Sequence, residues 1–207
     1  MEKMTEDYKF PLAEKCVMLR FDCDVLKHCT PFSCGDADLD DFFAHDAIAY
    51  DKDLLGKTYC WVLKDDNTEI VGMITLANAG IQTTHLQNNP KRHLNKNIAF
   101  PKRGRTYPAV LIGRLGVSSS YQGKQFRIGA QIMDFIKSWF DGVDNKTGCR
   151  FILVDAVNTE HALKYYSRNG FRPLFPHIED EKEFYGIPED EQLRTRMFYY
   201  DLLSGDY

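Results

Sequence analysis

The chain has 207 residues, of which 43% are hydrophobic and 27% are charged, as is ordinary for a folded globular protein. This length is sufficient for one domain with a full hydrophobic core, so we expect a single domain over residues 1–207. A formal net charge of −4 argues against a protein whose whole surface binds nucleic acid, but it leaves room for a local basic patch.

Six cysteines lie in a chain that has no N-terminal apolar run of the signal-peptide kind. Their spacings contain no close Cys-x2-Cys pair, so a zinc site would need ligands from unrelated elements. Four of them lie near His28, which keeps a metal site as an alternative, but reduced thiols are the simpler interpretation and we predict no metal. No stretch approaches the ~20 apolar residues that span a bilayer, so we expect a cytoplasmic protein without membrane contact.

The first half of the chain begins with polar, mixed residues 1–15, which we expect to form a loosely held terminus. The apolar segment 15–25 predicts a first strand, and a turn-rich link follows it. Asp36 is placed as a helix N-cap, and apolar residues at helical spacing predict a helix over residues 38–51. This helix should bury one apolar stripe.

A hairpin is predicted next, because segments 58–63 and 69–77 are rich in β-branched and aromatic residues and flank an Asx turn. Periodicity then fails from residue 81 to residue 108, which predicts a long loop. Within it, segment 91–105 is strongly basic and contains no acid. Its basic residues are Lys91, Arg92, Lys96, Lys102, Arg103 and Arg105. This basic loop is the best candidate for contact with a polyanion, although such a run is most often a solvated face.

The second half of the chain alternates predicted strands and helices, which indicates a right-handed βαβ core. The predicted elements are strand 109–117, a helix from residue 128 that Gly142 ends, strand 151–157, helix 160–168, a short strand from Phe171 and a final strand over 195–203. Segment 179–191 is acidic, and we interpret it as a solvated surface loop.

The centre of the chain is a strand that runs through a glycine-containing turn directly into an amphipathic helix. Gly123 and Gly129 lie in this turn. Such an arrangement presents backbone N–H groups and the positive end of a helix dipole to an anion. We therefore expect the stretch to bind a pyrophosphate.

Two motifs in this region resemble those of the GNAT superfamily of acyl-CoA-dependent N-acyltransferases. The first is the strand ending at Val117, followed by the turn and helix start QGKQFRIGA over residues 122–130. The second is Asn158, a helix, and then Tyr166 followed by Gly170 and Phe171. The resemblance implies an α+β fold: a mixed, mostly antiparallel sheet of about six or seven strands with a parallel βαβ core, flanked by helices. It also implies acetyl-CoA as the cosubstrate.

The resemblance carries over to specific residues. Tyr166 matches the tyrosine that in many members protonates the departing thiolate, and the backbone of residues 115–117 matches the segment that faces the thioester carbonyl. The implied CoA-binding residues are Leu115, Gly116, Val117, Gln122, Gly123, Lys124, Arg127, Ile128, Gly129, Ala130 and Asn158.

The turn departs from the family pattern, because Gln125 and Phe126 are extra and Arg127 replaces the first of two glycines. Glycine normally lets the backbone approach phosphate closely. An arginine would compensate by placing its guanidinium on a phosphate oxygen. The alternative is a turn that binds CoA weakly or not at all.

The general base is the second departure, because residues 109–120 contain no carboxylate. A water chain, Asp155 on the next strand, or an amine that is already largely neutral would meet the need. An α-amine with a pKa near ~8 needs less help than a lysine near ~10.4. We therefore expect transfer of an acetyl group to a primary amine on a small molecule or an α-amino group.

Two further functions stay open. One is a toxin that acetylates the α-amine of aminoacyl-tRNA, since the run GRLGV over residues 113–117 and the basic loop resemble such toxins. The other is a CoA-binding module without catalysis. The partners implied are the acceptor, tRNA through the basic loop, and a second copy of the chain in a homodimer.

Overall fold

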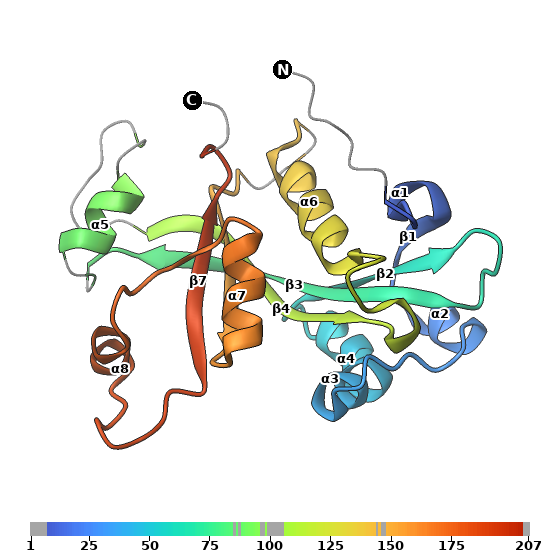
Figure 1. The fold of residues 1–207 in the computed structure, drawn as a ribbon, viewed down its shortest axis with the longest axis horizontal. Helices are drawn as coiled ribbons and strands as arrows, with labels where there is room; N and C mark the ends of the chain where they lie inside the picture. The colour runs from blue at the N-terminus through green and yellow to red at the C-terminus, as the bar shows by residue number, and fades with distance from the viewer. Residues whose placement is uncertain are drawn as a thin grey trace. The chain divides into compact units, whose positions relative to one another are not determined.

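The computed structural model describes residues 8–84, 86, 88–95, 98, 106–143, 145 and 148–204. It is a mixed, mostly antiparallel seven-stranded sheet with one parallel pair, flanked by helices, in the strand order β1-β2-β3-β4-β5-β7-β6 (Figure 1). The strands are β1 Cys16–Arg20, β2 Lys57–Leu63, β3 Ile70–Gln82, β4 Thr106–Val117, β5 Phe151–Val157, β6 Arg172–Pro173 and β7 Thr195–Asp201. The predicted fold class is confirmed.

The helices include a π-helical turn, η1, and a 3-10 turn, η2. They are α1 Leu12–Lys15, α2 Cys23–His28, α3 Ala37–Asp41, η1 Phe42–Asp46, α4 Ala47–Lys52, α5 Asn88–Asn95, η2 Ser119–Tyr121, α6 Ile128–Asp141, α7 Glu160–Arg168 and α8 Ile178–Tyr185. Within the described ranges, no helix has the length and apolar character needed to cross a membrane.

Internal contacts divide the chain into two compact units, each assembled from two separate stretches. Unit 1 contains residues 1–77 and 112–136, and unit 2 contains residues 78–111 and 137–207. The single domain over residues 1–207 stays a prediction.

The predicted hairpin forms the centre of unit 1. β2 pairs antiparallel with β3, and Asp66 in the connecting turn accepts hydrogen bonds from the backbone N–H of Thr68 at 3.0 Å and from its hydroxyl at 2.7 Å. This is the predicted Asx turn. β3 is longer than expected and continues to Gln82, while β1 adds to the free edge of β2.

Helices cover both faces of the unit 1 sheet: α3 and α4 lie on one face and the start of α6 on the other (Figure 1). Phe43 and Ala47 pack with Met73 on the first face. On the second face, a Cβ atom at Gly72 would lie 2.8 Å from Ile132 of α6, so glycine permits this close packing. The helix predicted over residues 38–51 is present, with Asp36 as its N-cap and the turn η1 in its middle.

Two predictions at the start of the chain are wrong. The strand predicted over residues 15–25 ends at Arg20, because Asp22 accepts hydrogen bonds from the N–H groups of Asp24 and Val25 and so begins α2. The terminus predicted to be loose contains the helix α1 Leu12–Lys15, and Leu12 is buried, whereas residues 1–7 of that prediction lie outside the described residues.

In unit 2, β5 and α7 match the predicted ranges 151–157 and 160–168 residue for residue. β5 pairs antiparallel with β7 along its whole length. Leu94 of α5 and Phe175 next to α8 share a buried cluster with Phe151 and Leu153 of β5. Tyr166 of α7 packs instead on Phe171 and Phe198.

Two segments predicted to be loops contain helices. The stretch 81–108 holds the end of β3, the helix α5 and the start of β4. The acidic stretch 179–191 holds most of α8, whose Glu181 is fully buried. Its carboxylate accepts hydrogen bonds from Arg196 Nε at 2.5 Å and from the Met197 N–H at 2.6 Å, so this acid is part of the core and not of a solvated loop.

Candidate active site

Gln122 ties the predicted pyrophosphate turn to the end of β4. Its Nε2 donates to the carbonyl oxygens of Val117 at 2.9 Å and Cys34 at 2.7 Å. Cys34 is held in turn by Asp40, which accepts a hydrogen bond from its N–H at 2.7 Å. Both of these hydrogen bonds are made within the protein, so the Gln122 side chain holds the turn in place.

The turn is closed by Gly123. Its φ is +109°, in a region that favours glycine, and its carbonyl accepts hydrogen bonds from the N–H groups of Phe126 and Arg127 at 3.3 and 3.1 Å. Arg127 itself has a φ of +50°, which costs a non-glycine residue about 1–2 kcal/mol. The chain thus keeps the left-handed backbone of a glycine at this position although the side chain has changed.

The start of α6 leaves donors open for an anion. The Arg127 carbonyl accepts the first intrahelical hydrogen bond, from the Gln131 N–H at 3.1 Å. The N–H groups of Ile128, Gly129 and Ala130 come before this bond and have no acceptor in the described structure. Three N–H groups at the start of a 14-residue helix are suited to a phosphate, although the Arg127 N–H is already engaged.

The N-terminal segment braces this turn. Gln131 Oε1 accepts a hydrogen bond from the Leu12 N–H at 2.8 Å, and Gln131 Nε2 donates to the carbonyl oxygens of Phe10 and Phe126 at 2.9 Å each. The Tyr121 ring contacts the rings of Phe10 and Phe126, with centroids 5.2 and 5.8 Å apart. The extra residue Phe126 is therefore packed against a fixed support, and we name this set of contacts the N-terminal brace.

Two cationic side chains lie on the turn. Arg127 is exposed, and its guanidinium lies 5.5 Å from the centroid of the Tyr8 ring. Lys124 is exposed as well. Both are placed on the same short turn as the open N–H groups, so they are suited to neutralise a pyrophosphate.

The strand segment 115–117 lies against aromatic rings. A Cβ atom at Gly116 would lie 3.1 Å from the rings of Phe32 and Phe43, so only glycine lets β4 pack this closely. Leu115 and Val117 are half-buried. The predicted contact of this backbone with a thioester carbonyl stays a prediction.

Tyr166 is held in unit 2 by α7, which Thr159 caps by accepting a hydrogen bond from the Ala162 N–H at 3.3 Å. Its ring packs against Tyr165 and Phe171, with centroids 5.1 and 5.7 Å away. The hydroxyl has no hydrogen-bond partner among the residues that the structure describes. Burial raises the pKa of Tyr166 to about 12, so the phenol is protonated at neutral pH and has a proton to donate.

Asn158 anchors the segment before β7. Its N–H donates to the Arg194 carbonyl at 2.9 Å and its Nδ2 donates to the Leu193 carbonyl at 2.8 Å. As in Gln122, the side-chain amide nitrogen donates to a carbonyl oxygen of the protein. Contact of Asn158 with CoA stays a prediction.

Asp155 lines a hollow of about 350 Å³ in unit 2, together with Tyr185 and Thr195. Asp155 is exposed to solvent, yet the surrounding atoms displace enough water to raise the pKa of its carboxyl group. A carboxylate with a raised pKa is a stronger base, which keeps Asp155 as a candidate for that role.

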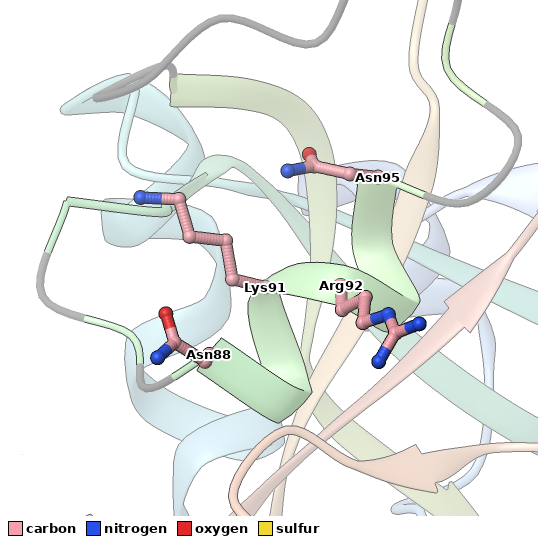
Figure 2. A pocket seen from close by; sticks show the side chains of 4 residues that line it. All are labelled: Asn88, Lys91, Arg92 and Asn95. Carbon is pink, nitrogen blue, oxygen red and sulfur yellow. The ribbon is translucent and has the colours of Figure 1, made fainter.

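A second hollow, of about 580 Å³, lies on α5. Figure 2 shows its four lining side chains, which all come from this helix: Asn88, Lys91, Arg92 and Asn95. We call this site, with its four lining residues, the α5 hollow. The sequence indicated Lys91 and Arg92 but missed the two asparagines, because a helix was not predicted over this stretch. The other basic residues of the predicted loop, Lys96, Lys102, Arg103 and Arg105, lie outside the described residues.

Metal ligands do not gather in the part of the chain that the structure describes: no group of three or more His, Cys, Asp or Glu side chains there could hold an ion. All six cysteines are free thiols. Burial raises the pKa of Cys60 to about 12, which makes it an unreactive core residue.

A family model described as "Acetyltransferase (GNAT) domain" matches residues 56–173, which is more than half of the chain. The chain belongs to the GNAT acetyltransferase family. The predicted acyl-CoA-dependent N-acetyltransferase is thereby confirmed at the level of the family, and so is acetyl-CoA as the cosubstrate. A comparison with curated proteins gave no match.

Solved structures share this GNAT fold. A crystal structure of a Tyr-to-Phe mutant of KacT is 19% identical, with a TM-score of 0.61, and the match covers 91% of this chain and 95% of that chain. AtaT complexed with acetyl-methionyl-tRNAfMet is 19% identical, with a TM-score of 0.60 and coverage of 90% and 94%. AtaTR bound with AcCoA is 18% identical, with a TM-score of 0.59 and coverage of 91% and 95%. Identities this low establish the shared fold alone.

Variants of Arg127 test whether the altered GNAT turn binds CoA. Arg127→Ala removes the guanidinium, and loss of a charge-assisted hydrogen bond should weaken CoA binding roughly ten- to a hundred-fold. Arg127→Gly removes the same group but relieves the positive φ, so it should be more stable than Arg127→Ala by about 1 kcal/mol. Calorimetric titration with CoA and urea denaturation measure the two effects. Unchanged CoA affinity in both variants would show that the guanidinium does not contact CoA.

Proposed function

We propose that the chain transfers an acetyl group from acetyl-CoA to the α-amine of an aminoacyl-tRNA. The observation that carries the proposal is the absence of any carboxylate on β4, the strand that presents residues 115–117. An acceptor amine with a pKa near ~8 is already partly neutral at pH 7, whereas a lysine side chain near ~10.4 is almost fully charged. A site without a base on this strand therefore favours an α-amine.

The α5 hollow supports the choice of tRNA as the carrier of that amine. Lys91 and Arg92 supply positive charge for phosphate oxygens, and Asn88 supplies amide hydrogen bonds from the same helix. The net charge of the chain is −4, so such contact has to be local. Among the structures of the same fold, AtaT was solved with acetyl-methionyl-tRNAfMet, which fits this acceptor class.

The reaction then needs three contributions from the chain. The open N–H groups of residues 128–130 and the Arg127 side chain hold the pyrophosphate, and the backbone of residues 115–117 stabilises the oxyanion as the amine nitrogen adds to the thioester carbonyl. The C–S bond breaks, and Tyr166 gives its proton to the leaving thiolate sulfur. The amine loses its proton to solvent, so Asp155 has no part in the chemistry.

Mass spectrometry of the products tests the acceptor class. Purified protein with acetyl-CoA should acetylate charged tRNA, and it should leave uncharged tRNA, N-blocked aminoacyl-tRNA and lysine-containing peptides unmodified. Asp155→Asn should retain the wild-type rate. Preferential acetylation of peptides would refute the proposal, and binding of acetyl-CoA without product from any amine would identify a CoA-binding module without catalysis.

The growth of cells that express the chain tests the same proposal and shows whether the protein acts as a toxin. Acetylation of aminoacyl-tRNA removes a substrate of translation, so expression of the wild-type chain should arrest growth and Tyr166→Phe should not. Normal growth with an active enzyme would exclude a toxin while leaving the chemistry intact.

A further inference from the structure

Arg114 is a half-buried cation on β4 that has no anionic partner among the residues that the structure describes. Its Nη1 donates to the carbonyl oxygen of its own neighbour, Gly113, at 2.9 Å. Its guanidinium carbon lies 5.0 Å from the centroid of the Phe42 ring. Its Nε is buried without a hydrogen-bond partner, and no carboxylate of the described residues forms an ion pair with it.

This arrangement is costly unless a ligand completes it. A guanidinium carries five N–H donors in a fixed fork, and here one protein oxygen accepts from it. A buried donor without an acceptor loses its hydration and gains nothing in return. Three other described arginines do have a carboxylate partner: Arg20 pairs with Asp51, Arg150 with Asp201 and Arg196 with Glu181. An unpaired arginine one residue before the segment 115–117 is therefore suited to an oxygen that arrives with a substrate.

The position of Arg114 indicates which substrate this is. Side chains alternate along a strand, so Arg114 and Gly116 share a face, and the contacts of both with Phe42, Phe43 and Phe32 show that this is the face covered by α3 and η1. The start of α6, with the open N–H groups proposed to bind pyrophosphate, lies on the opposite face of the unit 1 sheet (Figure 1). Arg114 is therefore on the other side of this sheet from the proposed pyrophosphate site.

An apolar hollow lies on this same face. Its volume is about 170 Å³, and its lining includes Phe32, Phe43 and Met73. Phe32 and Phe43 are also the rings that contact Gly116. The Phe42 ring, against which the Arg114 guanidinium lies, contacts the Phe43 ring of the hollow, with centroids 5.6 Å apart. A cation next to an apolar hollow matches an α-amino acyl group, which has a carbonyl oxygen next to its amine and a side chain on the same carbon.

We propose that Arg114 is an acceptor-binding residue whose guanidinium donates to the carbonyl oxygen adjacent to the attacking α-amine. The inference rests on the proposed function, because it takes the acceptor to be an α-amino acyl group. The oxygen is that of an ester, as in aminoacyl-tRNA, or that of a free carboxylate, and the two sources are separate arms of the test.

Steady-state kinetics with matched acceptors test this role. The acceptors are an amino-acid methyl ester, the free amino acid, an aminoacyl-tRNA, and an amine of similar pKa that lacks a carbonyl group. Arg114→Met keeps the length of the side chain and removes its donors, so KM for the carbonyl-bearing acceptors should rise roughly ten- to a hundred-fold. The carbonyl-free amine should show no change, and the dissociation constant of acetyl-CoA should stay at the wild-type value. Arg114→Lys, which keeps the charge, should recover part of the loss.

The outcomes separate this inference from the proposed function. If the wild type acetylates no α-amino carbonyl compound, both are wrong. If the wild type does so but Arg114→Met raises KM for none of the acceptors, or changes all four equally, then the inference alone is wrong. The inference is supported if Arg114→Met is as stable in urea as the wild type and its KM rises only for the carbonyl-bearing acceptors. A larger rise of KM for the ester than for the free amino acid identifies the ester as the natural group.

Discussion

Replacing Tyr166 by phenylalanine will lower kcat by about 10²- to 10⁴-fold, which is the usual contribution of a positioned general acid. The ring contacts with Tyr165 and Phe171 remain in the variant, so the fold and the affinity for acetyl-CoA should not change. The hydroxyl has no partner among the described residues, and so its removal breaks no hydrogen bond of theirs. Rapid-mixing kinetics and calorimetric titration with acetyl-CoA measure the two quantities.

The pH dependence follows from the burial that raises the pKa of Tyr166 to about 12. A general acid must be protonated, and this group loses its proton only as the pH rises through its raised pKa. Tyr166 should therefore cause no decline of kcat below about pH 10.

Tyr165 supplies the matched control, because Tyr165→Phe removes the neighbouring hydroxyl from the same helix. Its kcat should stay close to that of the wild type. Equal kcat values for wild type and Tyr166→Phe would remove Tyr166 from the mechanism. A decline of kcat below about pH 10 that Tyr166→Phe abolishes would instead show that the pKa of Tyr166 is not raised by its burial.

Replacing Glu181 by alanine will lower the free energy of unfolding by about 3–5 kcal/mol. Glu181 is fully buried and Arg196 is 8% exposed, so the substitution leaves a buried guanidinium without its anion. The Met197 N–H loses its acceptor as well. Equilibrium unfolding in urea measures the change.

Two controls separate the ion pair from general damage to α8. Glu183→Ala changes an exposed acid on the same helix and should alter stability by no more than about 0.5 kcal/mol. The double replacement of Glu181 by leucine and Arg196 by methionine removes both charges, and it should be closer to the wild type than either single variant. A double variant as unstable as the sum of the single ones would show that the pair itself is not what stabilises this region.

Local patterns predicted much of the fold. The predicted bounds of β5 and α7 agree with the structure, because a continuous apolar run and a capped amphipathic helix each fix their own ends. The hairpin matched because the Asx turn at Asp66 is set by residues two positions apart. α5 was missed because an eight-residue helix with a polar face gives too few periodic positions to be distinguished from a loop.

The sequence could not show which residues far apart along the chain form hydrogen bonds or ion pairs with each other. Glu181 looked like one acid among many, because the arginine that pairs with it lies 15 residues away. Gln122 and Asn158 were predicted to contact CoA, yet their amide nitrogens donate to Cys34 and Leu193, which are 88 and 35 residues distant. The motif indicated that Arg127 occupies a position where the family pattern has glycine. The structure agrees, because Arg127 has the positive φ that glycine favours.

The N-terminal brace has a consequence for how the chain folds. Gln131 joins Leu12 and Phe10 across 119 and 121 residues of sequence, so closing this contact carries the loop-closure entropy of more than half the chain. Contacts of such long range slow folding and form after local ones. The helix α6 and the hairpin are therefore expected to form before the pyrophosphate turn receives its support, and a nascent chain becomes able to hold CoA only when its two distant segments have met.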